Sequence, residues 1–170
     1  VPLGNTLATE DLVDAADADV VSYGQVVGIV PRAGREQATA RRLLGAHPQY
    51  DCWTRDTLPP RWRYGRHPRV PPIVCQMHEG WNALPRAIAQ AHLAAGHARG
   101  SHGYDPALPS MRAVFIAHGP AFRSGVVLPA FDNVDIYPLL MHLLGLPAQP
   151  GDGELRPLLP ALKPAATTRH

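Results

Sequence analysis

The sequence has little of what defines several common protein classes. Its 170 residues include two cysteines, 6% aromatic residues and 18% charged residues. No apolar run approaches the roughly 18 residues of a membrane span, so we expect no membrane partner. The first residues, VPLGNT, have neither the basic start nor the apolar stretch of a signal peptide, and we expect none in this chain.

Charge of one sign is also scarce. The formal net charge is +2 with a pI near 8.8, and the arginines are scattered, so no basic stripe predicts a nucleic-acid polymer as partner. The hydrophobic content of 45% suffices for one ordinary domain with a core. The 19 prolines and 15 glycines argue against long uninterrupted helices. Nothing in these numbers indicates an oligomeric state.

Two cysteines are too few to define a redox compartment. Cys52 and Cys75 both lie in segments that we expect to be strands. They could form a disulfide, or each could be a small buried apolar residue. The residues leave both alternatives open.

Periodicity predicts a compact α+β unit in the first half of the chain. β-branched and aromatic content predicts strands, and apolar spacing predicts a helix that ends at a glycine. The expected order is an acidic, loosely helical lead-in (7–18), a strand (20–30), a helix (35–45), a strand (50–58), a short helical turn (59–62) and a strand (71–78).

The second half predicts fewer elements. They are a helix-compatible link (84–100), a strand (111–117) and a helix (134–144) that Gly145 ends. We therefore divide the chain into a lead-in (1–19), an α+β subdomain (20–81), a larger C-terminal part (82–162) and a frayed tail (163–170).

Nine histidines raise the question of a metal site. Most have a simpler interpretation: His47 and His67 precede prolines in loops, and His142 is expected to be a packed helical residue. His92 and His97, five positions apart, do not share one helical face. His102 lies in the loop GSHGYDP, where glycines allow close backbone approach. Taken alone, it is a possible metal ligand, although such a histidine is more often exposed or structural.

The run from this loop through ALPSMRAVFIAHGP resembles the C-terminal signature of the nucleotide pyrophosphatase/phosphodiesterase family, a branch of the alkaline phosphatase superfamily. Two further blocks support the resemblance: RYGRHPRVPPIV followed by HEGW, and GPAF followed by FDNVDIY and LLGL. The blocks occur in order from about residue 20 to 162. The likeness is closest to bacterial, periplasmic members.

The resemblance implies an α/β fold: a partial alkaline-phosphatase-like sheet with a small α+β subdomain. It implies zinc as cofactor, with two ions in the complete enzyme, and His102 as a ligand of one of them. It implies a nucleotide or phosphodiester substrate, release of a nucleoside monophosphate, and a periplasmic or secreted location for the complete enzyme. The identity of the substrate does not follow.

Much of the family's machinery is missing from the sequence. In the family, a threonine attacks phosphorus, and two zinc ions about 4 Å apart clamp the phosphoryl group. The last ligand pair before the histidine loop lies in an Asp-His-Gly-Met segment, and no Asp-His pair occurs in this chain. None of the seven threonines has the context expected of the nucleophile. We therefore expect no catalytic residue here, and enzymatic activity of the chain alone stays uncertain.

Three interpretations follow. The chain could be the C-terminal part of a zinc phosphodiesterase, inactive by itself. It could be a non-catalytic remnant or an interaction module built on the α+β subdomain. A single-site metal-binding protein is the third, disfavoured because a catalytic zinc needs about three protein ligands.

Overall fold

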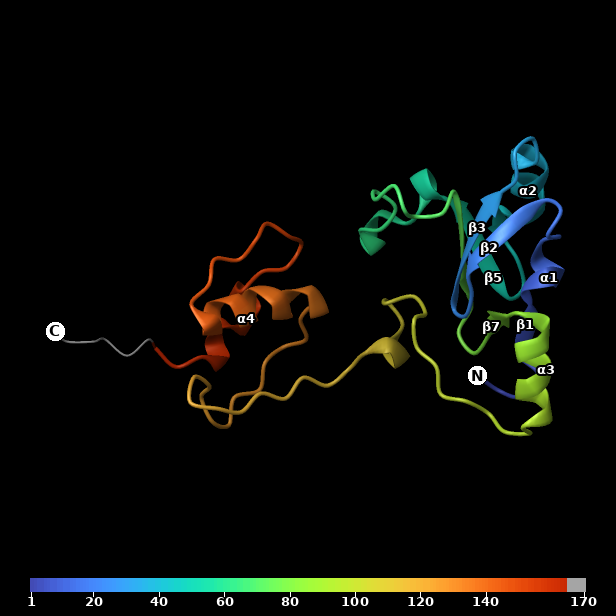
Figure 1. Ribbon diagram of the computed structural model, residues 1–170. Helices are drawn as coiled ribbons and strands as arrows, with labels where there is room; N and C mark the ends of the chain where they lie inside the picture. Colours follow the sequence, from blue (N-terminus) through green and yellow to red (C-terminus); the bar gives the residue numbers. More distant parts are fainter. Residues whose placement is uncertain (165–170) are drawn as a thin grey trace. The chain divides into compact units, whose positions relative to one another are not determined.

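The computed structural model describes residues 1–164, which fall into two compact units, Val1–Ala113 and the part that begins at Val114 (Figure 1). Most of the predicted tail (163–170) lies outside the described residues. The four-part division predicted from the sequence differs from these two units and stays a prediction. Within the described part of the chain, no helix is both long and apolar enough to cross a membrane.

The first unit is organised by a five-stranded sheet in which every neighbouring pair is antiparallel. In spatial order its strands are β2 (Ala18–Ser22), β3 (Val26–Pro31), β6 (Ile73–Met77), β5 (Tyr50–Thr54) and β4 (Gly45–Ala46). The single strand predicted for residues 20–30 is therefore a hairpin. Gly24 lies where the chain reverses between β2 and β3, and its φ of 117° is a conformation that glycine adopts readily.

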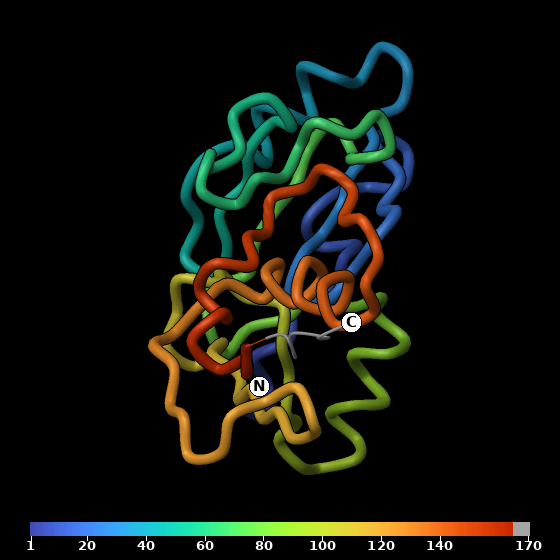
Figure 2. The backbone as a smooth tube through the Cα atoms, turned by 90° about the vertical axis from the view of Figure 1, so that its left-hand side faces the viewer, coloured from blue at the N-terminus to red at the C-terminus, as the bar shows by residue number. Residues whose placement is uncertain are grey.

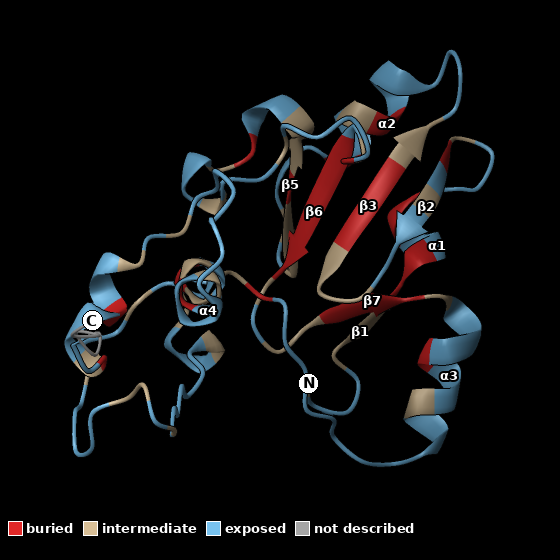
Figure 3. Cartoon of the chain, turned by 60° about the vertical axis from the view of Figure 1, so that its left-hand side comes forward, coloured by how far each residue is buried: buried red, intermediate tan, exposed pale blue. Residues whose placement is uncertain are grey.

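Strand β6 lies in the middle of this sheet and is buried along its whole length (Figure 3). Its residues alternate between two faces, as the two-residue period of a strand requires. Ile73, Cys75 and Met77 belong to the main hydrophobic core, whereas Val74 packs with a smaller cluster around Leu58 and Val70. Gln76 is the buried polar member of the strand.

Helices and turns of the first unit lie close to the predicted positions. The predicted helix 35–45 is α2 (Glu36–Leu43), which buries Thr39 and Leu43. The predicted helical turn 59–62 is the 3₁₀ helix η2 (Pro60–Trp62). Strand β5 ends earlier than expected, because Arg55–Thr57 forms the 3₁₀ helix η1.

A second, two-stranded sheet lies in the same unit. Strands β1 (Thr6–Ala8) and β7 (Asn82–Leu84) pair in parallel. The short helix α1 (Thr9–Leu12) follows β1, and α3 (Arg86–Ala94) follows β7 directly after Pro85. The link predicted to be helical is thus a helix over its first half.

The unit that begins at Val114 is built around one helix. The 3₁₀ helix η4 (Asn133–Asp135) leads into α4 (Ile136–Leu144), and Gly145, with φ of 66°, ends α4 as predicted. The 3₁₀ helix η5 (Arg156–Ala161) closes a small core made of Leu139, Leu158 and Leu162. Residues 121–123 exchange backbone hydrogen bonds with 161–163, so the two segments lie side by side (Figure 2).

The strand predicted for residues 111–117 is wrong. Pro109–Met111 forms the 3₁₀ helix η3, and residues 112–117 have no regular structure. Val114 and Ile116 are each 85% exposed. A strand forms only when its N–H and C=O groups meet those of a neighbouring strand. No described strand pairs with this segment, so its apolar content is not sufficient to form a strand.

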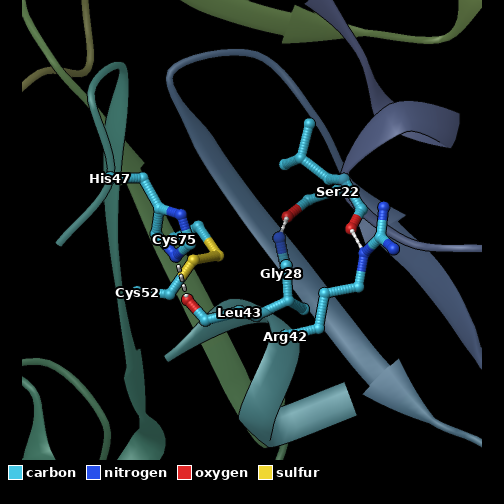
Figure 4. Close-up of a disulfide and its surroundings, with 8 residues drawn as sticks. Ser22, Gly28, Arg42, Leu43, His47, Cys52 and Cys75 are labelled. Atoms are coloured by element: carbon cyan, nitrogen blue, oxygen red, sulfur yellow. Dashed lines mark hydrogen bonds between the residues drawn. A yellow bond between two sulfur atoms is a disulfide. The ribbon is translucent and has the colours of Figure 1, made fainter. Parts of the chain in front are cut away.

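The two cysteines form a disulfide, which decides the alternative left open by the sequence (Figure 4). Cys52 on β5 and Cys75 on β6 are directly opposite each other in the antiparallel register, with Cα atoms 4.0 Å apart. Both are almost completely buried in the main core. The bond therefore joins two neighbouring strands from within the core.

Removal of the disulfide should lower the free energy of unfolding by about 3 kcal/mol, the value that chain entropy gives for a loop closed by residues 23 positions apart. The variant Cys52→Ala/Cys75→Ala measures this in urea denaturation. Its unfolding midpoint should match that of the original chain under reducing agent. Equal stability of the oxidised chain and the double variant would contradict the prediction.

Candidate functional site

His102 lies in the loop of residues 100–106, between α3 and η3 of the first unit, where the backbone has no helix or strand. The next residue, Gly103, has φ of 93°, a conformation that side chains rarely allow. The imidazole is exposed and makes no hydrogen bond or ion pair with the described residues. The strand at whose entrance His102 was expected does not form.

The two residues after His102 are fixed to the body of the unit. The carbonyl oxygen of Gly103 accepts a hydrogen bond of 3.2 Å from the side-chain amide of Gln76 on β6. Tyr104 is buried in the main core, and its hydroxyl donates to the carbonyl oxygen of Trp81 at 2.9 Å. Burial is the largest cause of a raised Tyr104 pKa.

Asp105 is held by Arg61 of η2. The two guanidinium nitrogens donate to the two carboxylate oxygens, Nη1 to Oδ1 at 2.5 Å and Nη2 to Oδ2. Oδ1 also accepts the backbone N–H of Ala107 at 2.9 Å. Hydrogen bonds from Arg61 are the largest cause of an Asp105 pKa below its ordinary value. The carboxylate therefore stays charged under ordinary conditions.

The other histidines do not join His102. His78 on the turn after β6 faces the carboxylate of Asp51 at 3.1 Å and the carbonyl oxygen of Pro48 at 3.2 Å. His47 contacts the carbonyl oxygen of Leu43 at 2.9 Å (Figure 4). Its ring also stacks on Tyr50. His142 was expected to be packed on its helix, but it is exposed.

The described residues do not bring together three histidines, cysteines, aspartates or glutamates that could hold a metal ion. His102 fits a single nitrogen ligand, because its ring is exposed and without a partner there. It does not make a site by itself, since a zinc site needs about three protein ligands. We therefore derive no chemical step through zinc from the residues of this chain.

An open cavity of about 340 Å³ lies beside the loop, in the first unit. Its polar walls include the pairs Arg61–Asp105 and Asp51–His78, and its apolar walls include Trp53 and Trp62. The charged groups on its walls are mostly paired with each other. The cavity therefore borders the contacts that hold the loop, and its walls offer few unpaired charged groups to a ligand.

Arg61 and Gln76 are residues that sequence reasoning missed. Arg61 is 44 positions from Asp105, and Gln76 is 27 positions from Gly103, so no local pattern connects them. The one usable signal was a glutamine inside the apolar run IVCQM, because a buried polar side chain needs partners.

Comparison with known proteins identifies the family. Residues 1–105 match the family described as Type I phosphodiesterase / nucleotide pyrophosphatase. Human ectonucleotide pyrophosphatase/phosphodiesterase family member 5 is 36% identical over 134 residues, which are 79% of this chain and 27% of the relative. Human bis(5'-adenosyl)-triphosphatase ENPP4 is 31% identical over 85% of this chain and 30% of the relative. This chain belongs to the type I phosphodiesterase/nucleotide pyrophosphatase family.

Solved structures agree with this assignment. Murine ectonucleotide pyrophosphatase/phosphodiesterase 5 matches 94% of this chain and 41% of its own, with a TM-score of 0.81 and 33% identity. An inactive variant of the same murine protein, in complex with AMP, gives a TM-score of 0.80. The predicted α/β fold with a partial alkaline-phosphatase-like sheet is confirmed. The chain spans less than a third of the curated relatives and less than half of the solved ones.

Replacement of His102 should leave the stability of this chain nearly unchanged. An exposed ring without a partner in the described residues contributes little, so His102→Ala should shift the free energy of unfolding by less than about 0.5 kcal/mol. Tyr104→Phe is the matched comparison, since it leaves the carbonyl oxygen of Trp81 without its partner and should cost about 1 kcal/mol. Urea denaturation measures both, and a large loss in His102→Ala would assign the histidine a structural role.

Asp105 should make the stability of the chain sensitive to acid. Its pKa in the folded chain lies below the ordinary value of 3.8. The stabilisation is therefore present above that value and is lost as the pH falls through the lowered pKa. In Asp105→Asn, the free energy of unfolding should fall less steeply between about pH 5 and pH 2, as urea denaturation at several pH values can show. Parallel pH profiles for the two chains would contradict the assignment.

Proposed function

We propose that this chain is the C-terminal part of a zinc-dependent phosphodiesterase/nucleotide pyrophosphatase. The complete enzyme would hydrolyse phosphodiester or pyrophosphate bonds of nucleotides and release nucleoside monophosphates. The observation that carries the proposal is the family match over residues 1–105, which ends within the loop that contains His102. The AMP bound to the murine relative supports a nucleotide as the substrate class.

His102 is the residue that we propose as a metal ligand. Its imidazole is exposed, while Gly103, Tyr104 and Asp105 are fixed to the unit, as the loop of a metal ligand requires. The nucleophile and the remaining ligands would come from residues outside this chain. Bound zinc would polarise the phosphoryl group and activate the nucleophile.

The proposal also includes a periplasmic or secreted location for the complete enzyme and a likeness to bacterial members of the family. Relatives named ectonucleotide pyrophosphatases and a disulfide in the core support a periplasmic or secreted location. The relatives reported above are mammalian, so the particular likeness to bacterial members remains a prediction from the sequence blocks.

A non-catalytic remnant or interaction module is the second candidate. It is favoured by the lack, in residues 1–164, of any group of three potential metal ligands. The DNA upstream of the Val1 codon separates the two candidates. In-frame codons for Asp-His-Gly-Met would support the enzyme, and a stop codon in their place would support the remnant.

The 170-residue chain alone should not hydrolyse a nitrophenyl phosphodiester of a nucleotide, even with added zinc, because it lacks a positioned nucleophile and a second metal site. The product of the complete reading frame should hydrolyse it, with release of nitrophenol measured by absorbance. There His102→Ala should lower kcat/KM by at least about 100-fold, the scale of losing a metal-site interaction. His97→Ala, which removes another exposed histidine, should leave kcat/KM unchanged.

Turnover by the pure 170-residue chain well above the buffer rate would contradict the assignment of the nucleophile to residues outside it. An active complete product in which His102→Ala and His97→Ala behave alike would remove His102 from the metal site. A complete product without activity would favour the non-catalytic candidate.

A further inference from the structure

The loop of His102 combines a free side chain with a fixed backbone. Three consecutive residues after the histidine are each attached to a different part of the first unit: Gly103 to β6, Tyr104 to the turn before β7, and Asp105 to η2. His102 itself, the residue before them, has no partner in the described residues.

The link between Asp105 and Arg61 is more exposed than the links through Gln76 and Tyr104. The side chain of Arg61 is 52% exposed and that of Asp105 is 23% exposed. Their two parallel hydrogen bonds fix direction as well as distance, which a single contact does not. The bond from Ala107 N–H to Asp105 then carries this orientation into the following turn.

The link through Gln76 comes from a buried side chain. Gln76 lies on the central strand with 9% of its surface exposed, and its amide nitrogen contacts the carbonyl oxygens of Gly103 at 3.2 Å and Gln25 at 3.0 Å. The same nitrogen therefore connects the loop with the residue that precedes β3. Its removal would leave both carbonyl groups without this donor.

We propose that Arg61 and Gln76 are positioning residues for His102: they hold the loop so that the imidazole is presented to a metal ion at a fixed place. A ligating side chain must be held within about 0.5 Å of its productive geometry by a supporting set of contacts. The inference rests on the proposed function, because His102 is a ligand only in the complete enzyme. Arg61 acts through Asp105, and Gln76 acts through Gly103.

The test measures backbone order in the 170-residue chain by NMR relaxation, without zinc or substrate. The amides of residues 102–107 should have order parameters near 0.85 in the original chain. In Arg61→Ala and in Asp105→Asn they should fall toward about 0.6, and the double variant should fall no further, because both changes remove the same pair. Arg61→Lys should restore little, since an ammonium group cannot engage both oxygens as a guanidinium does.

Arg86→Ala is the matched control. Arg86 forms an ion pair of 2.5 Å with Asp11, its side chain is 49% exposed, and its hydrogen bonds go to Glu10 and Asp11 rather than to the loop. It should leave the order of residues 102–107 unchanged, and all these variants should unfold at midpoints close to one another. Gln76→Met should also lower the order parameters of residues 102–107. Because Gln76 is buried, this result counts only if the variant still unfolds cooperatively.

Unchanged order in Arg61→Ala and Asp105→Asn would overturn the proposal, as would an equal loss in Arg86→Ala or full restoration by Arg61→Lys. A loss of backbone order throughout the first unit, beyond residues 102–107, would make Arg61 a structural residue and would also overturn it. Since the measurement involves no zinc, its failure is distinct from a failure of the phosphodiesterase assay. In the complete product, Arg61→Ala should then lower the zinc content per chain, measured by atomic spectroscopy, while Arg86→Ala should not.

Discussion

The hydrogen-bonded pairing of β6 with β3 and β5 is the interaction on which the rest of the first unit depends. Through this strand the core receives Ile73 and Met77 on one face, and the small cluster receives Val74 on the other. The same register places Cys75 opposite Cys52, where the disulfide joins the two strands. It also places Gln76 against the histidine loop. One strand therefore connects the stability of the sheet with the position of the candidate ligand.

Local patterns predicted the elements whose formation depends on local interactions. Helix α2, the turn η2 and the glycine that ends α4 were placed within a few residues, because caps, prolines and apolar spacing are properties of short segments. The hairpin at Gly24 was missed, since β-branched and aromatic residues occur on both sides of the reversal in VVSYGQVVGIV. Pattern alone does not separate one long strand from two short ones joined by a tight turn.

Contacts between distant residues were outside the reach of such patterns. His102 was selected from a motif, but its supports come from Arg61 and Gln76 on other elements. The disulfide was one of two alternatives until the register of β5 and β6 placed the cysteines opposite each other. The failed strand at residues 111–117 has the same origin, because strand formation depends on a neighbour that the segment itself cannot reveal.

The exposed apolar side chains in the part that begins at Val114 follow from the same dependence. Val114, Ile116 and Val127 are apolar residues of extended segments, and Leu144 lies on a face of α4 away from its small core. Burying such side chains is the main stabilising contribution to folding, so a sequence that leaves them exposed forgoes that gain. The histidine loop shows the converse arrangement: Gly103, Tyr104 and Asp105 are held within the first unit, while the side chain proposed to meet the metal has no contact among the described residues. The residues that support the loop therefore differ from the residue that we propose for the chemistry. The scaffold of His102 is local to the first unit, whereas no described residue joins His102 in a group that could hold a metal ion.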